Sequence, residues 1–131
     1  MEEYEYMTKV MIADDDPSVL SSTAFLLERI FGYQVVTVSR ASEIFEAIRR
    51  EHPDILLQDV RMPGLNIASH LQAIRSDGHT ASLPVLIFTG ASEEGMAQAV
   101  GADATVGKPF NPETLRELIE TWAHHRHVSR P

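Results

Sequence analysis

Carboxylate, hydroxyl and ammonium side chains recur in this chain at one kind of position, directly after a short hydrophobic segment. Such segments are typical of buried strands, and the carboxyl ends of parallel strands meet along one edge of a sheet. Side chains that are far apart in the sequence would therefore meet in one crevice, where they could bind a divalent cation and a phosphoryl group. These residues are Asp14, Asp15, Asp59, Thr89 and Lys108.

Composition limits the classes of protein to which the chain can belong. Its 131 residues suffice for one domain, and 44% hydrophobic with 23% charged residues is typical of a globular protein. A net charge of −8 argues against direct nucleic-acid binding, which needs a basic face. With no cysteine, disulfides and thiolate zinc sites are excluded. No apolar stretch approaches the roughly 18 residues of a membrane span. We expect a cytoplasmic domain that binds neither nucleic acid nor membrane.

Hydrophobic periodicity predicts five strands that alternate with helices. The expected strands are Lys9–Ala13, Gln34–Val38, Asp54–Gln58, Leu83–Phe88 and Ala104–Val106. Helices are expected from Pro17 to Gly32, over residues 41–48 and 67–74, at Glu93–Val100, and from Pro112 to Ala123. The first and last helices have clear start signals, because Asp16 and Asn111 can act as N-caps directly before a proline.

This alternation predicts an α/β fold with a parallel sheet and helices on both faces. Five units suit a flavodoxin-like, doubly wound sheet with strand order 2-1-3-4-5, whose switch point lies between strands one and three. The acidic residues after strand one and Asp59 after strand three should meet at that point.

In these features the chain resembles the response-regulator receiver domains of two-component signalling, from about Lys9 to Ala123. That family has an acidic pair after strand one, an aspartate after strand three, Thr or Ser after strand four and Lys-Pro after strand five. The corresponding residues are Asp14 with Asp15, Asp59, Thr89, and Lys108 with Pro109. The resemblance implies a phosphoacceptor that a histidine kinase or a histidine phosphotransfer protein phosphorylates, and a downstream protein or effector domain that reads the result.

Each residue then has an expected role. Crowded carboxylates raise one another's pKa unless a cation joins them, and hard oxygen ligands suit Mg²⁺. We expect Asp15, Asp59 and the main-chain carbonyl of Arg61 to bind the metal directly, and Asp14 to act through water. Asp59 is the expected nucleophile, which forms an aspartyl-phosphate. Lys108 and the Thr89 hydroxyl would then bind phosphoryl oxygens.

Other interpretations fit parts of this pattern. A phosphatase of the haloacid-dehalogenase type also uses a strand-end aspartate, but it requires a second aspartate where this chain has Arg61. A degenerate receiver, which keeps the fold and acts as a phosphate-independent interaction module, is the main alternative. Trp122 is interpreted as a core residue. His124, His125 and His127 are interpreted as a solvated helix end rather than a metal site.

The chain departs from the family pattern in the segments that usually transmit the signal. Thr105 stands where Tyr or Phe is usual, so Thr89 and Thr105 are the expected switch positions. Gly107 replaces a branched residue and should weaken strand five. The loop at Leu65–Ile67 lacks the usual glycine. The short interval between Thr89 and Gly101 predicts a fourth helix nearly a turn short, on the face through which receivers commonly dimerise.

We therefore predict a signalling switch that catalyses only its own phosphorylation and slow dephosphorylation. The expected organisation is an N-terminal tail at residues 1–8, a receiver domain at 9–123 and a C-terminal tail at 124–131. Such a chain is either a stand-alone regulator or part of a longer one.

Overall fold

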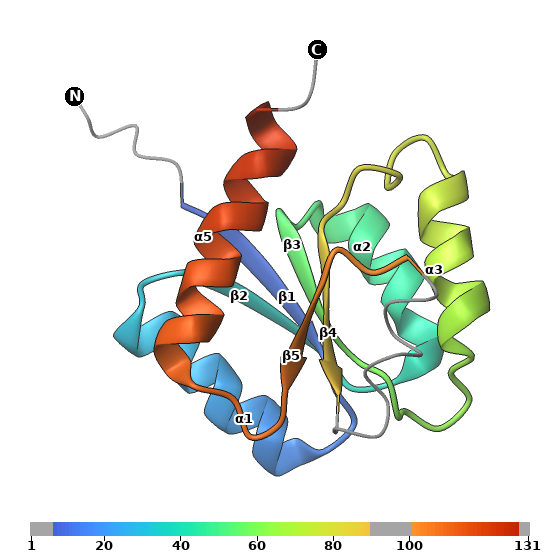
Figure 1. Cartoon of the computed structure of the whole chain (residues 1–131). Coiled ribbons are helices and arrows are strands. Elements are labelled where there is room, and N and C mark those ends of the chain that lie inside the picture. The colour runs from blue at the N-terminus through green and yellow to red at the C-terminus, as the bar shows by residue number, and fades with distance from the viewer. Residues whose placement is uncertain (1–6, 90–100, 129–131) are drawn as a thin grey trace.

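The structure, a computed structural model, describes residues 7–89 and 101–128, with backbone alone for residues 124–128. Its centre is a parallel five-stranded sheet in the order β2-β1-β3-β4-β5 (Figure 1). The predicted flavodoxin-like strand order is therefore confirmed. The strands are β1 (Lys9–Ala13), β2 (Gln34–Val38), β3 (Ile55–Asp59), β4 (Val85–Thr89) and β5 (Ala104–Gly107).

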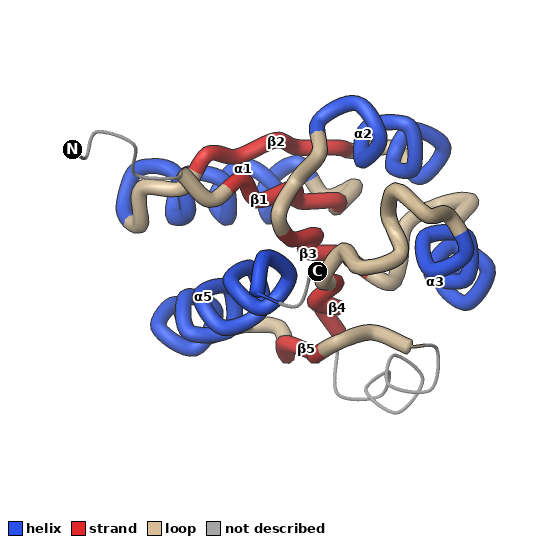
Figure 2. The backbone as a smooth tube through the Cα atoms, turned by 90° about the horizontal axis from the view of Figure 1, so that it is seen from above, coloured by secondary structure: helices blue, strands red, loops and turns tan. Residues whose placement is uncertain are grey.

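Helices cover both faces of the sheet. Figure 2 shows α1 and α5 on one side of the strands and α2 and α3 on the other. The helical segments are α1 (Pro17–Phe25), the π-helical η2 (Leu26–Ile30), the 3₁₀ segment η3 (Ala41–Glu43), α2 (Ile44–Glu51), α3 (Ile67–Ser76) and α5 (Pro112–Val128). The helix expected at Glu93–Val100 lies outside the described residues.

The two layers have separate hydrophobic cores because successive side chains of a strand point to opposite faces. In β3, Ile55 and Leu57 pack in the core beneath α1 and α5, while Leu56 packs beneath α2 and α3. All five residues of β3 and of β4 are buried, as the lack of polar alternation predicted. The central strands are thus rigidly held, and so are the residues at their ends.

The start of the first helix follows its sequence signals. The Asp16 side chain accepts hydrogen bonds from the backbone N–H groups of Ser18 and Val19, and Pro17 is the first helical residue. The helix then changes to a π-helical turn, in which the N–H of Phe31 donates to the carbonyl of Leu26. Gly32 ends it with φ of 80°, a conformation that favours glycine.

Several boundaries differ from the prediction by one or two residues. The third strand begins at Ile55 because the side chain of Asp54 turns back to accept the N–H of Lys9 at 2.8 Å. It ends at Asp59 itself, which pairs in register with Phe88. The fourth strand begins at Val85, because Pro84 before it has no N–H to donate to the ladder.

The last helix is longer than predicted. Its N-cap Asn111 accepts from the N–H groups of Glu113 and Thr114, as expected, but the helix continues to Val128. The backbone of residues 124–128, expected in a tail, is therefore helical. Because α5 runs back against the strand direction, it ends at the edge of the sheet where the strands start, opposite the strand carboxyl ends (Figure 1).

Within residues 7–89 and 101–128, none of the helices combines the length and the apolar character needed to cross a membrane.

Candidate functional site

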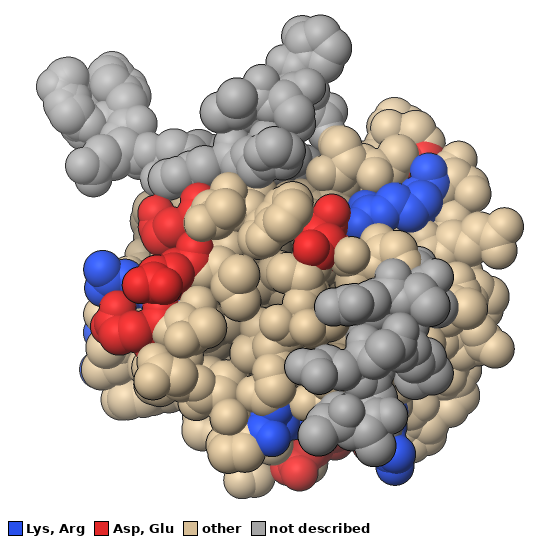
Figure 3. All heavy atoms as spheres, viewed as in Figure 1, with Lys and Arg blue, Asp and Glu red and all other residues tan. Residues whose placement is uncertain are grey.

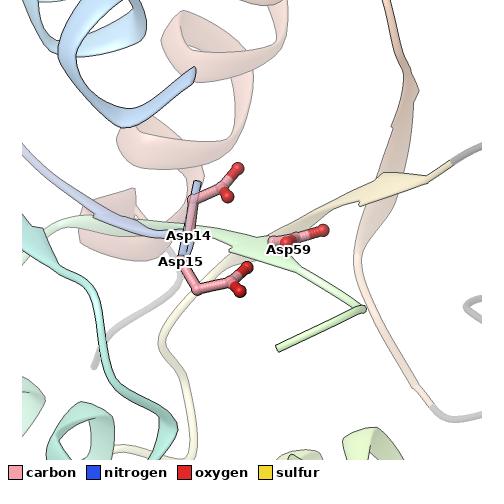
Figure 4. Close-up of side chains that lie close together, drawn as sticks. All are labelled: Asp14, Asp15 and Asp59. Carbon is pink, nitrogen blue, oxygen red and sulfur yellow. The ribbon is translucent and has the colours of Figure 1, made fainter. Parts of the chain in front are cut away.

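Three carboxylates meet where β1 and β3 end. Asp14 and Asp15 follow β1 directly, and Asp59 is the last residue of its neighbour β3. One carboxylate oxygen from each residue lies within 4.8 Å of the other two, and the three side chains point into the same space (Figure 4). Asp14 and Asp59 are buried, whereas Asp15 is exposed. The expected convergence at the switch point of the sheet is present.

Lys108 supplies the positive charge of this crevice. Its Nζ lies 3.3 Å from Oδ2 of Asp14 and 3.3 Å from Oδ1 of Asp59. Its backbone N–H donates to the carbonyl of Thr89 at 2.9 Å, which fixes the residue at the end of β5. The side chain also passes the ring of Phe88, with Nζ 5.7 Å from the ring centroid. One ammonium group therefore partly neutralises two buried carboxylates.

The electrostatic environment of Asp59 favours its neutral form. Burial is the main cause that raises the pKa of Asp59, and the Asp14 carboxylate raises it further. Lys108 acts in the opposite direction, as does the backbone N–H of Arg61, which lies 3.4 Å from Oδ1. A further cation in the crevice would favour the ionised form of Asp59.

The three carboxylates have the donor chemistry that Mg²⁺ requires. Mg²⁺ prefers oxygen ligands and keeps several of its waters, so one or two carboxylates and an open side suffice. Asp15 supplies the open side, because it borders a cavity of about 580 Å³ beside the loops at residues 39–42 and 63–66. Both oxygens of Asp14 already have protein partners, since Oδ1 accepts the N–H of Asp16 and Oδ2 contacts Lys108. Asp15 and Asp59 are thus the better candidates for direct ligands.

Thr89 and Thr105 lie on the strands next to this site. Thr89 ends β4 and is 1% exposed, and it pairs in register with Gly107. Thr105 is half-buried and pairs with Ile87, so by strand alternation it lies on the same face of the sheet as Thr89. The segment that follows Thr89 lies outside the described residues.

The loop after Asp59 forms a tight turn. The N–H of Leu65 donates to the carbonyl of Met62 at 3.0 Å, and Gly64 has φ of 81°. Asn66 then caps α3 by accepting the N–H of Ser69 at 3.0 Å. The chain therefore reaches α3 without the glycine that receivers usually have at residues 65–67.

Two residues of this region were not identified from the sequence. Gln58 is fully buried, and its Oε1 lies 2.9 Å from Nε2 of His70 on α3. Its Nε2 donates to the main-chain carbonyl of Asp59, also at 2.9 Å. The available signal was the amide side chain of Gln58 in an otherwise apolar segment, because a buried polar group needs a partner.

Known proteins share both the sequence pattern and the fold. The chain matches the response regulator receiver domain family over residues 10–120. Protein PilH of Pseudomonas aeruginosa is 31% identical over 116 residues, which cover 86% of this chain and 95% of that protein. Response regulator Rre1 of Synechocystis is 28% identical over 113 residues, which cover 84% of this chain and 49% of that protein.

A solved structure agrees with these sequence matches. The response regulator receiver domain protein from Clostridium thermocellum has a TM-score of 0.85 at 26% identity, and the match covers 95% of this chain and all of that one. Fold, acidic crevice and sequence point in the same direction. The chain belongs to the response regulator receiver domain family, the phosphorylation switches of two-component signalling.

Proposed function

We propose that Asp59 accepts a phosphoryl group in a Mg²⁺-dependent reaction and that its phosphorylation switches the domain between two signalling states. The observation that carries this proposal is the position of Lys108 Nζ, 3.3 Å from the carboxylate of Asp14, which follows β1, and 3.3 Å from that of Asp59, which ends β3. Such an arrangement suits a site that stabilises added negative charge. The expected donors are a histidine kinase or a histidine phosphotransfer protein.

The residues of the crevice have distinct tasks in this reaction. A carboxylate oxygen of Asp59 attacks phosphorus while the bond from phosphorus to the donor imidazole breaks, and the imidazole, already protonated on its other ring nitrogen, leaves as the neutral base. Lys108 and the Arg61 N–H both contact Oδ1 of Asp59, which favours Oδ2 as the attacking oxygen. Mg²⁺, bound by Asp15, Asp59 and the Arg61 carbonyl, would neutralise charge on the phosphoryl oxygens.

Two side chains respond once the phosphoryl group is attached. Lys108 shifts its ion pair from Asp59 to a phosphoryl oxygen, which keeps its charge neutralised. The Thr89 hydroxyl donates to another phosphoryl oxygen. Thr105 offers no aromatic ring to follow Thr89, so we expect the change to stay close to β4.

Incubation with acetyl phosphate and Mg²⁺ tests the proposal. Intact-protein mass spectrometry should show one added phosphoryl group on the wild type and none on Asp59→Asn or in the presence of a chelator. Asp16→Asn is the matched control, because it removes a neighbouring charge while an asparagine still caps α1. Asp15→Asn should lose the thermal stabilisation that Mg²⁺ gives to the wild type. An unmodified wild type would favour the phosphate-independent interaction module instead.

A further inference from the structure

A buried hydrogen-bonded pair links the phosphoacceptor strand to α3. Gln58 directly precedes Asp59 in β3. Its side chain is completely buried on the face of the sheet that α2 and α3 cover. Its amide nitrogen donates to the Asp59 carbonyl at 2.9 Å and lies 3.5 Å from Sδ of Met62. Its amide oxygen faces Nε2 of His70 at 2.9 Å. Every polar atom of the Gln58 side chain therefore has a partner.

This geometry determines the protonation of His70. Because the amide nitrogen of Gln58 must donate to a carbonyl, the amide oxygen faces the histidine and can only accept. His70 must then carry a hydrogen on Nε2. Burial lowers the pKa of His70, so the neutral form with its hydrogen on Nε2 is the expected one at neutral pH.

Gln58 contacts both ends of the Asp59–Met62 loop, which carries two candidate metal ligands, the Asp59 carboxylate and the Arg61 carbonyl. Asp59 and Met62 lie on either side of Val60 and Arg61, and the side chain of Gln58 contacts both of them. Within the Asp59–Met62 loop the Arg61 N–H contacts Asp59 Oδ1, and the Arg61 carbonyl is a proposed metal ligand. Through its contact with Gln58, His70 connects this loop to α3, a helix whose Leu71 and Ile74 are fully buried in the core.

We propose that Gln58 and His70 are positioning residues that hold the Asp59–Met62 loop in the geometry required for Mg²⁺ binding. This inference rests on the proposed function, because it concerns the same metal site. Partners behind metal ligands commonly change affinity about tenfold or more when they are removed. The pair touches no ligand oxygen in the crevice itself, so its effect must pass through the loop backbone.

A purely structural role would have a different signature. If the pair only satisfied buried polar groups, its removal would change stability equally in the presence and absence of Mg²⁺. If it positions the loop, the dissociation constant for Mg²⁺ must change in protein that remains folded. Mg²⁺ affinity, rather than melting temperature alone, separates the two roles.

Gln58→Met is the main variant, because methionine is similar in length and lacks both hydrogen-bonding groups. We expect its dissociation constant for Mg²⁺, measured by titration calorimetry on folded protein, to rise about tenfold. The control is Gln72→Met, which makes the same change at an exposed position on α3. An unchanged dissociation constant in Gln58→Met would overturn the inference. A wild type that binds no Mg²⁺ would instead refute the proposed metal site itself.

His70→Ala tests the other end of the pair, and it inserts no apolar group beside Asp59. A smaller loss of Mg²⁺ affinity is expected, with His79→Ala as the control for an exposed histidine. Nitrogen-detected NMR of the wild type should find the hydrogen of neutral His70 on Nε2, and the Gln58→Met spectrum should lose this preference. A hydrogen on Nδ1 in the wild type, or full Mg²⁺ affinity in His70→Ala, would contradict the assigned roles.

Discussion

Asp59 is held between opposing electrostatic influences. Burial and the neighbouring Asp14 carboxylate favour the neutral acid, whereas Lys108 and the Arg61 N–H favour the carboxylate that chemistry needs. The balance raises the pKa of Asp59, so ionised Asp59 costs free energy in the folded, metal-free protein. A bound cation would remove that cost, which couples metal binding to the readiness of the nucleophile.

The raised pKa gives a pH-dependent prediction for Asp59→Asn. In the folded protein Asp59 binds its proton more tightly than in the unfolded chain, so wild-type stability falls as pH rises from the unfolded pKa through the folded one. Asparagine avoids this loss. Without Mg²⁺ we therefore expect Asp59→Asn to be more stable than the wild type at about pH 7.5 and to lose that advantage below about pH 4.

Urea denaturation in a chelating buffer at several pH values measures this difference. Asp16→Asn, an exposed change beside the crevice, should show no comparable pH dependence. A stability difference for Asp59→Asn that stays constant with pH would mean that the carboxyl is not perturbed as the structure implies.

At the scale of elements, β5 is the weakest member of the sheet. It has four residues at one edge, of which Val106 alone is buried, and its last residue is Gly107 opposite Thr89. A side-chain carbon added at Gly107 would meet no atom within 4 Å, and the φ of this residue is not in the left-handed region. Space and backbone conformation therefore do not require glycine here.

Gly107→Ala should stabilise the protein by about 0.5–1 kcal/mol, because alanine reduces the conformational entropy of the unfolded chain. Gly64→Ala is the matched control. Gly64 also has open space around it, but its φ of 81° strains any other residue, so this variant should lose about 1 kcal/mol. Thermal or urea unfolding of both variants would reveal the opposite signs, and destabilisation by Gly107→Ala would indicate that glycine has a local role at this position.

The strands and most helix starts could be predicted from the sequence, whereas contacts between elements could not. Short apolar segments that alternate with helical patterns located all five strands, and capping residues such as Asp16 and Asn111 located two helix starts. The positions of Asp14, Asp15, Asp59 and Lys108 at or directly after strand ends predicted that they lie close together, because parallel strands end at one edge of the sheet. The contact between Gln58 and His70 could not be predicted, since it depends on how α3 rests on β3. The extension of α5 to Val128 was missed because its last turns lack apolar periodicity.

For the molecule as a whole, the surface near β5 and α5 determines how two copies could meet. Exposed Glu113, Glu117 and Glu120 lie along α5, and Figure 3 shows acidic side chains gathered over the flank of α5 that faces away from β5. A symmetric pair that joined α5 to α5 along this flank would bring like charges together, which disfavours association. On the other side of α5, the half-buried Thr105 and the open position at Gly107 add little apolar area to an interface through β5.

We therefore expect no dimer that depends on phosphorylation through this face. Sedimentation velocity with and without beryllofluoride and Mg²⁺ should find a monomer in both conditions, at about 0.1 M salt, where surface charges are only partly screened. Mass spectrometry of the acetyl phosphate reaction provides the control that the site is active. A dimer that forms with the mimic and is lost in Glu117→Arg would show that α5 does form the contact.

The direction of α5 has a practical consequence for building reporters. Because α5 ends at the edge of the sheet where β1 starts, a fluorophore on the last turn of α5 would lie at the edge remote from Asp59 (Figure 1). A second label at Thr8, directly before β1, would lie at the same edge of the sheet, and the two labels would leave the acidic crevice open to a phosphodonor. The efficiency of energy transfer between the two labels should stay constant on phosphorylation if the structural change is confined to the crevice. A change in this efficiency would show that the structural change reaches the opposite edge of the sheet.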